Sequence, residues 1–147
     1  ELSRITEDAV IHFHELSDEI KAVEQQLTEI NELKTHVLNY IRTREVYAAY
    51  RQAGYSKRFA AEHQQEIQLH QASKKAFDKL GIKKLPKVRD LQNQFGDQLQ
   101  KKKALYEDYR KAKDEMRSML TAKANIERIL RISEEADRHE QKQTHTR

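Results

Sequence analysis

Two histidines that flank a phenylalanine, His12 and His14, have a spacing that can serve a metal site. On a β-strand alternate side chains share one face, so a His-Phe-His triplet there can direct both imidazoles at one metal ion. The surrounding residues follow a helical pattern instead, and two such positions on a helix diverge by about 200° around its axis. We therefore interpret both histidines as surface residues beside a core residue, Phe13, and predict no metal site here.

A second pair, His63 and His70, lies seven residues apart and thus on one face of a helix. A helical zinc pair usually has a spacing of four residues and an acidic third ligand, and this pair has neither. We interpret both as packing residues, and we expect most tyrosines at helix interfaces, with the ring buried and the hydroxyl in water. The chain also offers no Ser/His/Asp or Cys/His set and no glycine-rich phosphate loop. The sequence predicts no catalytic residue, no metal and no cofactor.

Short runs of lysine and arginine are the stronger functional signal. Three runs in the middle of the chain supply the candidate DNA-binding residues: Lys57, Arg58, Lys74, Lys75, Lys79, Lys83, Lys84, Lys87 and Arg89. The second and third runs flank one predicted turn between helices, so they are placed to form a single patch. Such a patch would neutralise phosphates and bind DNA without reading its sequence. The alternative is a solvated lysine face paired with an acidic first helix.

Charge is distributed unevenly along the 147 residues, whose formal net charge is +4. Residues 1–53 carry a net charge of −4, residues 54–132 carry +9 and the remainder carries −1. A basic middle section indicates a polyanionic partner or pairing with the acidic first segment. The absence of cysteine excludes disulfides and thiolate metal sites and fits a reducing compartment. No apolar run approaches the ~18 residues of a membrane span, so no membrane insertion is predicted.

Long helices must position these residues. Charged residues make up 35% of the chain and hydrophobic residues 37%, with three glycines and one proline, a composition that favours long helices around a narrow core. From Phe13 to Ile30 apolar residues recur at steps of three and four, which is the heptad pattern of a coiled coil. At 1.5 Å per residue such a first helix would be about 70 Å long.

Three helices are predicted, over residues 5–53, 57–80 and 87–132. Gly54 and Gly81 end the first two, Ser56 caps the second, and Pro86 suits the first turn of the third. The expected fold is all-α, an elongated antiparallel helical bundle or coiled coil with two long helices and a shorter middle helix. Residues 1–132 would form a single elongated three-helix domain. Residues 133–147 would form a charged, frayed or disordered tail.

Three stretches together resemble the C-terminal helical region of relaxases, the mobilisation nucleases of bacterial integrative and conjugative elements. They are TREVYAAYRQAGYSKRFAAEH from Thr43, LHQASKKAFDKLGIKKLPKVRDLQ from Leu69 and KKKALYEDYRKAKDEMRSMLTAKANIERIL from Lys101. The resemblance covers residues 31–130, and YRQAGYSKRF and KKAFDKLGIKKLP are its most specific parts. In that family the metal-binding histidines and the nicking tyrosine belong to an N-terminal domain that no part of this sequence matches, so no catalytic residue carries over.

The resemblance implies a role in single-strand DNA transfer in the bacterial cytoplasm. We expect a non-catalytic accessory domain that contacts the DNA phosphate backbone and helps to assemble the DNA-processing complex at the transfer origin, beside other conjugation or relaxosome proteins. The alternative is a coiled-coil module for protein interaction or dimerisation. In that case the heptad stripe of the first helix pairs with a second copy, as a homodimer, or with the transfer machinery, without binding DNA.

Overall fold

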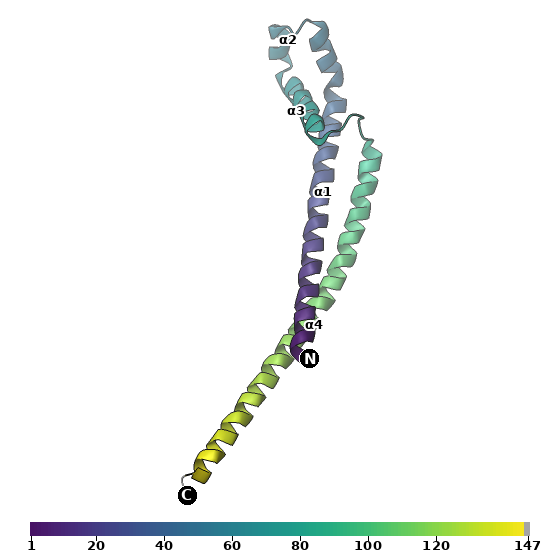
Figure 1. Cartoon of the computed structure of the whole chain (residues 1–147). Coiled ribbons are helices and arrows are strands. Elements are labelled where there is room, and N and C mark those ends of the chain that lie inside the picture. The colour runs from purple at the N-terminus through teal and green to yellow at the C-terminus, as the bar shows by residue number, and fades with distance from the viewer. Residues whose placement is uncertain (146–147) are drawn as a thin grey trace. The chain divides into compact units, whose positions relative to one another are not determined.

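All regular secondary structure in the computed structural model is α-helical (Figure 1), within residues 1–145, which are the residues that the structure describes. The helices are α1 (Leu2–Gln52), α2 (Lys57–Glu62), α3 (Gln64–Leu80) and α4 (Val88–His145). The prediction of an all-α chain with two long helices is therefore confirmed. The shorter section between them differs from the prediction, because it consists of two helices.

Two glycines end α1 and α3 by the same backbone arrangement. Gly54 has a φ of +65° and Gly81 a φ of +69°, in the left-handed region that glycine enters without a steric penalty. After α1, the N–H of Tyr55 donates to the carbonyl of Tyr50 at 3.0 Å, and the corresponding bond after α3 measures 2.9 Å. This pairing is the Schellman motif. Both predicted helix ends are confirmed.

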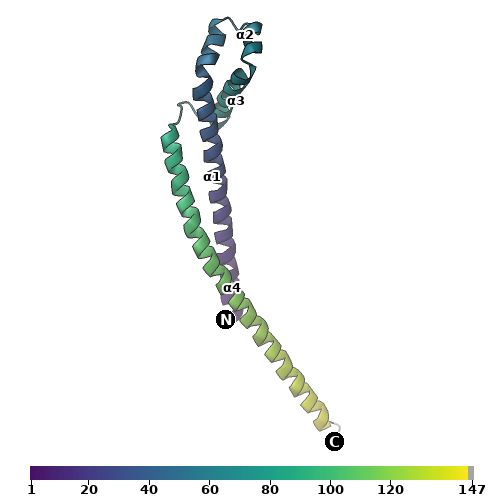
Figure 2. The ribbon, with the colours of Figure 1, turned by 180° about the vertical axis from the view of Figure 1, so that it is seen from behind.

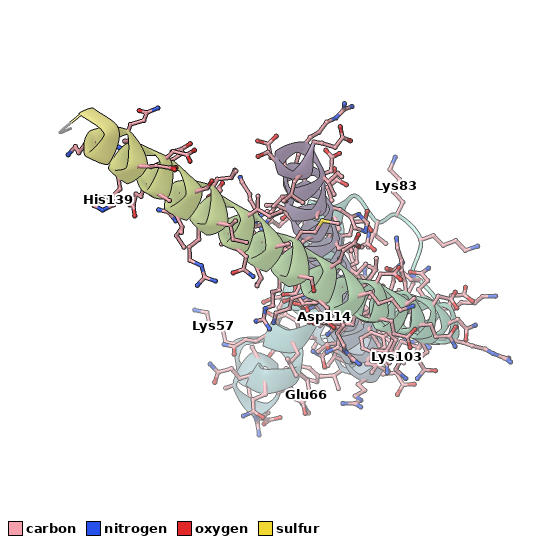
Figure 3. All side chains as sticks on the ribbon, turned by 90° about the horizontal axis from the view of Figure 1, so that it is seen from below. Lys57, Glu66, Lys83, Lys103, Asp114 and His139 are labelled. Carbon is pink, nitrogen blue, oxygen red and sulfur yellow. The ribbon has the colours of Figure 1, made fainter. Side chains whose placement is uncertain are left out.

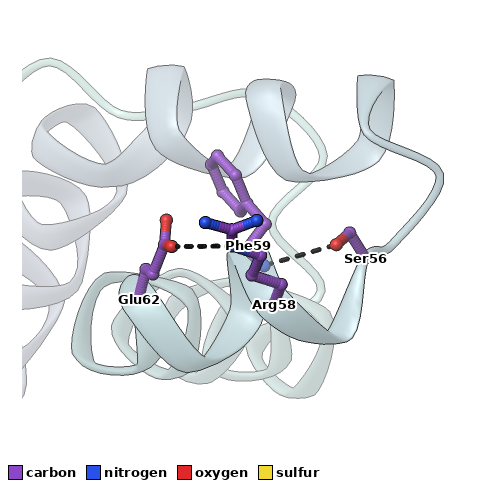
Figure 4. A network of polar contacts seen from close by, with 4 residues as sticks. All are labelled: Ser56, Arg58, Phe59 and Glu62. Atoms are coloured by element: carbon purple, nitrogen blue, oxygen red, sulfur yellow. Dashed lines mark hydrogen bonds and ion pairs between the residues drawn. The ribbon is translucent and has the colours of Figure 1, made fainter.

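The predicted single helix over residues 57–80 is wrong, because the structure breaks it at His63. Ser56 caps α2 as predicted, since its Oγ accepts a hydrogen bond from the backbone N–H of Phe59 at 3.4 Å (Figure 4). At His63 φ is −124° and ψ is 33°, outside the helical range. No glycine or proline marks this break. It lets Phe59 stack on Tyr50 of α1, at 6.0 Å between ring centroids, while α3 packs on α1 separately.

The section from α2 to α3 runs antiparallel to α1. Ring contacts pair Tyr50 with Phe59, Tyr47 with His70, and Tyr40 with Phe77, so the residue numbers fall along α1 as they rise along the other chain. Both ribbon views show α3 beside the second half of α1 (Figure 2). The Schellman turn after α1 therefore brings residues up to 37 positions apart in sequence into contact.

The last helix is longer than predicted. α4 continues past Ile132 to His145, so the structure is helical over residues 133–145, where a frayed or disordered tail was expected; residues 146–147 lie outside the described range. Every side chain from Ala124 to Lys142 is exposed. Because this stretch contains four glutamates and three arginines, which are good helix formers, intrinsic helix propensity favours the helix where no core supports it.

The chain divides into two compact units, and α1 and α4 contribute to both. Unit 1 consists of Glu1–Ala22 and Lys102–Arg147, and unit 2 consists of Val23–Lys101. The buried apolar residues of unit 1 include Leu16 and Ile20 from α1 and Leu105 and Ala112 from α4. The rings of Phe13 and Tyr109 also meet in this unit, with 4.9 Å between their centroids.

Unit 2 contains a core in which three helices meet. Val37 of α1, Phe77 of α3 and Leu91 of α4 form a buried cluster, and Val37 has no exposed surface. Half-buried apolar residues surround this cluster: Ile30, Leu33, Tyr40, Ile82, Leu85 and Val88. Two of these, Ile82 and Leu85, come from the loop between α3 and α4. The loop that carries the predicted lysine run is thus attached to the core of unit 2 by its apolar residues.

Candidate nucleic-acid interface

The nine basic residues predicted to bind DNA all belong to unit 2, and all nine side chains are exposed. They are spread over α2, α3, the loop that follows α3 and the first turn of α4. Figure 3 shows Lys57 and Lys83 pointing to different sides, so these two do not share a surface. Arg58 already contacts a carboxylate, that of Glu62, at 3.4 Å (Figure 4). Exposed pairs of this kind stabilise little, but the carboxylate offsets the charge of Arg58.

The lysines of α3 separate into two environments. Lys74 borders a hollow with Lys83 and Asp78, so the structure brings together one residue from the second run and one from the third. Lys79 lines a different hollow, which it shares with Glu29 and Glu32 of α1. The two environments therefore differ in charge, although the lysines are only five positions apart on one helix.

A second hollow beside Lys74 carries more positive charge than either of these. Its lining comes from the last turns of α1 and from α3: Tyr40, Arg44, Glu45, Tyr47, Ala48, Arg51, His70 and Lys74. Steps of three and four along α1 place these α1 residues, apart from Glu45, on one side of the helix, and Lys74 follows His70 by one turn of α3. Three cationic side chains and one carboxylate therefore surround this hollow, which we call the arginine hollow.

Sequence reasoning missed two residues of the arginine hollow, Arg44 and Arg51. Both lie in the segment 1–53, whose net charge is negative, but nine of its ten acidic residues lie at or before Glu32. Their spacing of seven residues, equal to that of Tyr40 and Tyr47 on the same face, was the available signal.

A buried histidine, His70, is one of the residues that line the arginine hollow. His70 is 3% exposed, and its ring lies between the rings of Tyr40, at 4.8 Å, and Tyr47, at 4.3 Å between centroids. The interplanar angles are 24° and 17°, so the three rings form a stack. The prediction that His70 is a packing residue is confirmed, and the tyrosines beside it serve the same purpose.

A hydrogen-bond chain defines the orientation of His70. The Thr43 hydroxyl donates to the backbone carbonyl of Asn39, with 2.6 Å between the oxygens. Since a hydroxyl has one proton, the contact of 3.0 Å between Thr43 Oγ1 and His70 Nδ1 requires His70 to donate. Nδ1 of the neutral ring therefore carries the proton, and Nε2 carries the lone pair.

Burial lowers the pKa of His70 below its ordinary value of 6.5, and the charges of Lys74 and then Arg51 lower it further. Each of these influences disfavours the imidazolium ion, the first through lost hydration and the other two through repulsion. The histidine thus responds to the positive potential of the arginine hollow. The ring is therefore uncharged at neutral pH.

The aromatic rings around the arginine hollow are engaged with one another. Phe77 contacts Tyr40 in a T-shaped arrangement at 5.7 Å, and Tyr50 contacts Tyr47 in the same manner at 5.9 Å. The ammonium group of Lys74 also lies 5.6 Å from the centre of the Tyr47 ring. These rings pack helices together, and the His70 ring fills the space between Tyr40 and Tyr47. The chemistry left open to an incoming ligand is that of the cations.

The remaining sequence candidates lie elsewhere. His12 and His14 are exposed on α1, while Phe13 between them is half-buried against Tyr109, as interpreted from the sequence. In the part of the chain that the structure describes, no three His, Cys, Asp or Glu side chains gather closely enough to hold a metal ion.

None of the helices within residues 1–145 combines the length and the apolar character needed to cross a membrane. The chain matches no protein-family model, and neither a curated protein nor a solved structure is significantly similar to it.

Proposed function

We propose that this chain is a non-catalytic accessory segment of a relaxase that contacts the phosphate backbone of DNA through unit 2. The observation that carries the proposal is the arginine hollow, where Arg44, Arg51 and Lys74 meet with a single carboxylate, that of Glu45. The link to relaxases rests on the resemblance of residues 31–130. In this role the segment helps to assemble the DNA-processing complex at the transfer origin, in the bacterial cytoplasm and beside other conjugation proteins.

Phosphate contact fits the arginine hollow better than base recognition does. Guanidinium and ammonium groups bind phosphate oxygens through charge-assisted hydrogen bonds, and each neutralised phosphate releases counterions. Base recognition would need a free aromatic face or polar side chains that reach base edges. The faces of Tyr40 and Tyr47 that flank His70 are occupied by its ring. Binding of this kind is independent of sequence and weakens steeply with salt.

Charge reversal at two lysines of α3 tests the proposal. Lys74→Glu removes a cation from the arginine hollow, whereas Lys79→Glu makes the same change beside Glu29 and Glu32. With a fluorescein-labelled duplex in an anisotropy titration, we expect Lys74→Glu to weaken binding about tenfold at low salt and to reduce the salt slope by about one. Lys79→Glu should change both quantities much less. Absence of DNA binding at low salt, or equal losses in the two variants, would refute the proposed interface.

A protein-interaction role is the second candidate, and exposed apolar residues on α4 favour it. Leu120, Ile126, Ile129 and Leu130 are 43–60% exposed in unit 1. The predicted stripe on α1 is less suitable, since Leu16 and Ile20 in unit 1 and Val23 and Leu27 in unit 2 are at most 8% exposed and thus already buried within this chain. In this alternative α4 pairs with a second copy of the chain, and the long helices pack as a bundle or coiled coil on their heptad spacing.

Light scattering over a range of protein concentrations tests self-association. If α4 pairs with a second copy, Leu130→Glu should shift a dimer to monomer, because it places a charge in an apolar contact. Thr121→Glu is the matched control, since residue 121 lies about 180° around α4 from Leu130, and Thr121 is already polar and exposed. A strict monomer at high concentration, or equal effects of the two variants, counts against this candidate.

A further inference from the structure

We propose that the arginine hollow is a phosphate site whose occupancy is coupled to protonation of His70, so that phosphate and proton bind cooperatively. The ligand class is a phosphate ester or diphosphate, and DNA supplies it through its backbone. The inference deepens the proposed function and rests on it for the identity of the natural ligand.

The geometry places the titrating ring in the lining of the same hollow as the cations and prevents it from moving away. His70 is held by two stacked tyrosines and by the hydrogen bond from its Nδ1 to Thr43 Oγ1, at 3.0 Å. That bond leaves Nε2 as the atom that accepts a second proton. Because the donor Nδ1–H is present in both charge states, protonation does not require the hydrogen bond to break.

The charged groups around His70 come from two helices. α1 supplies Arg44, Glu45 and Arg51, together with the phenols of Tyr40 and Tyr47, and α3 supplies Lys74. Lys74 and Arg51 oppose a positive charge on the ring, which is one reason why its pKa lies below 6.5 in the free protein. The carboxylate of Glu45 acts in the opposite sense, but the lining contains three cations.

A bound phosphate reverses this balance. Its negative charge offsets Lys74 and Arg51, so the imidazolium of His70 becomes less unfavourable and the pKa of the ring rises on binding. Thermodynamic linkage requires the reciprocal effect, in which a protonated His70 adds a positive charge and strengthens phosphate binding. The solvent-exposed cations alone would bind a DNA phosphodiester with little dependence on pH, because neither the diester nor these cations titrate between about pH 5 and 7. The buried ring therefore makes affinity sensitive to pH between about 5 and 7, where histidine titrates.

The first experiment compares wild type with His70→Gln in DNA binding at two pH values. Glutamine can still donate to Thr43 Oγ1, but it cannot acquire a charge. We expect wild type to bind the labelled duplex about fivefold more tightly near pH 5.5 than near pH 7.5, and His70→Gln to lose that gain. His63→Gln is the matched control, since His63 is a partly exposed histidine of unit 2 beside Glu66. It should keep the pH dependence of wild type.

The second experiment uses the unaltered chain and inorganic pyrophosphate, so it does not depend on the folding of a variant. The ring protons of His70, followed by NMR, should titrate at higher pH when pyrophosphate is present. DNA binding with the same pH dependence in His70→Gln as in wild type overturns the coupling and leaves the proposed function intact. Absence of DNA binding together with a pyrophosphate-dependent shift at His70 refutes the DNA role and retains the phosphate site. An unchanged His70 titration refutes the phosphate site.

Discussion

Two threonines, one in each unit, are equally buried but have different partners. Thr6 of unit 1 and Thr43 of unit 2 are each 3% exposed, and each hydroxyl donates to the backbone carbonyl four residues earlier, at 2.7 Å and 2.6 Å. Among residues 1–142, whose side chains the structure describes, the hydroxyl of Thr43 also contacts the side chain of His70 on α3. The hydroxyl of Thr43 therefore makes a local hydrogen bond within α1 and, in addition, a tertiary contact with the imidazole ring of His70 on α3.

The two units also differ in charge, and the difference lies in the acids. Each unit contains fourteen lysines and arginines, but unit 2 has nine acidic residues and unit 1 has fifteen. Unit 2 therefore has a net charge of +5 and unit 1 of −1. A phosphate ligand responds to the local potential and not to the number of cations. The arginine hollow arises in the unit where carboxylates are scarce.

The largest expected effect is a loss of unfolding free energy, and it should be large in the core of unit 2 and small at the exposed apolar residues of unit 1. Phe77→Ala removes a ring that is 8% exposed and contacts both α1 and α4 residues, so it should lower the free energy of unfolding by about 3 kcal/mol. Ile129→Ala, at a side chain that is 60% exposed, should cost less than about 0.5 kcal/mol. Urea unfolding followed by circular dichroism measures both. Similar losses would show that α4 of unit 1 is covered in solution.

Substitution of the buried threonine of unit 2 should have an intermediate effect on the free energy of unfolding, and substitution of its counterpart in unit 1 a smaller one. Thr43→Val keeps the shape of the side chain but leaves Nδ1 of His70 without its acceptor, which should cost about 1–2 kcal/mol. Thr6→Val removes only a bond to a carbonyl that already belongs to α1, so its cost should be under about 0.5 kcal/mol. The same unfolding measurement applies. Equal costs would mean that the contact with His70 adds nothing to the stability of unit 2.

The smallest expected effect is on the pH dependence of stability. Because the pKa of His70 is lowered in the folded chain, the unfolded chain binds more protons as the pH falls below 6.5, and stability declines. Above that pH both states are neutral at this residue and its contribution is constant. His70→Gln should therefore show a smaller loss of thermal stability than wild type between neutral pH and about pH 5. A profile of His70→Gln identical to that of wild type would contradict the assignment.

Much of the helical framework could be predicted, but less of the candidate site. Of the nine predicted basic residues, Lys74 lies in the arginine hollow, while Lys79 lies beside acids of α1. Arg44 and Arg51 were missed because the net charge was summed over residues 1–53, and this sum concealed the basic C-terminal part of the segment. The roles of these side chains depend on which face of α1 meets α3, and a pattern within either helix does not contain that information.

The sequence by itself determined where several helices begin and end. Gly54 and Gly81 supply the positive φ of a Schellman motif, and Ser56 supplies a cap, and each acts through hydrogen bonds to residues at most five positions away. The tertiary structure alone decided the break at His63 and the assembly of the arginine hollow. The physical reason is the range of the contacts, since Thr43 and His70 are 27 residues apart and meet only when α3 packs against α1.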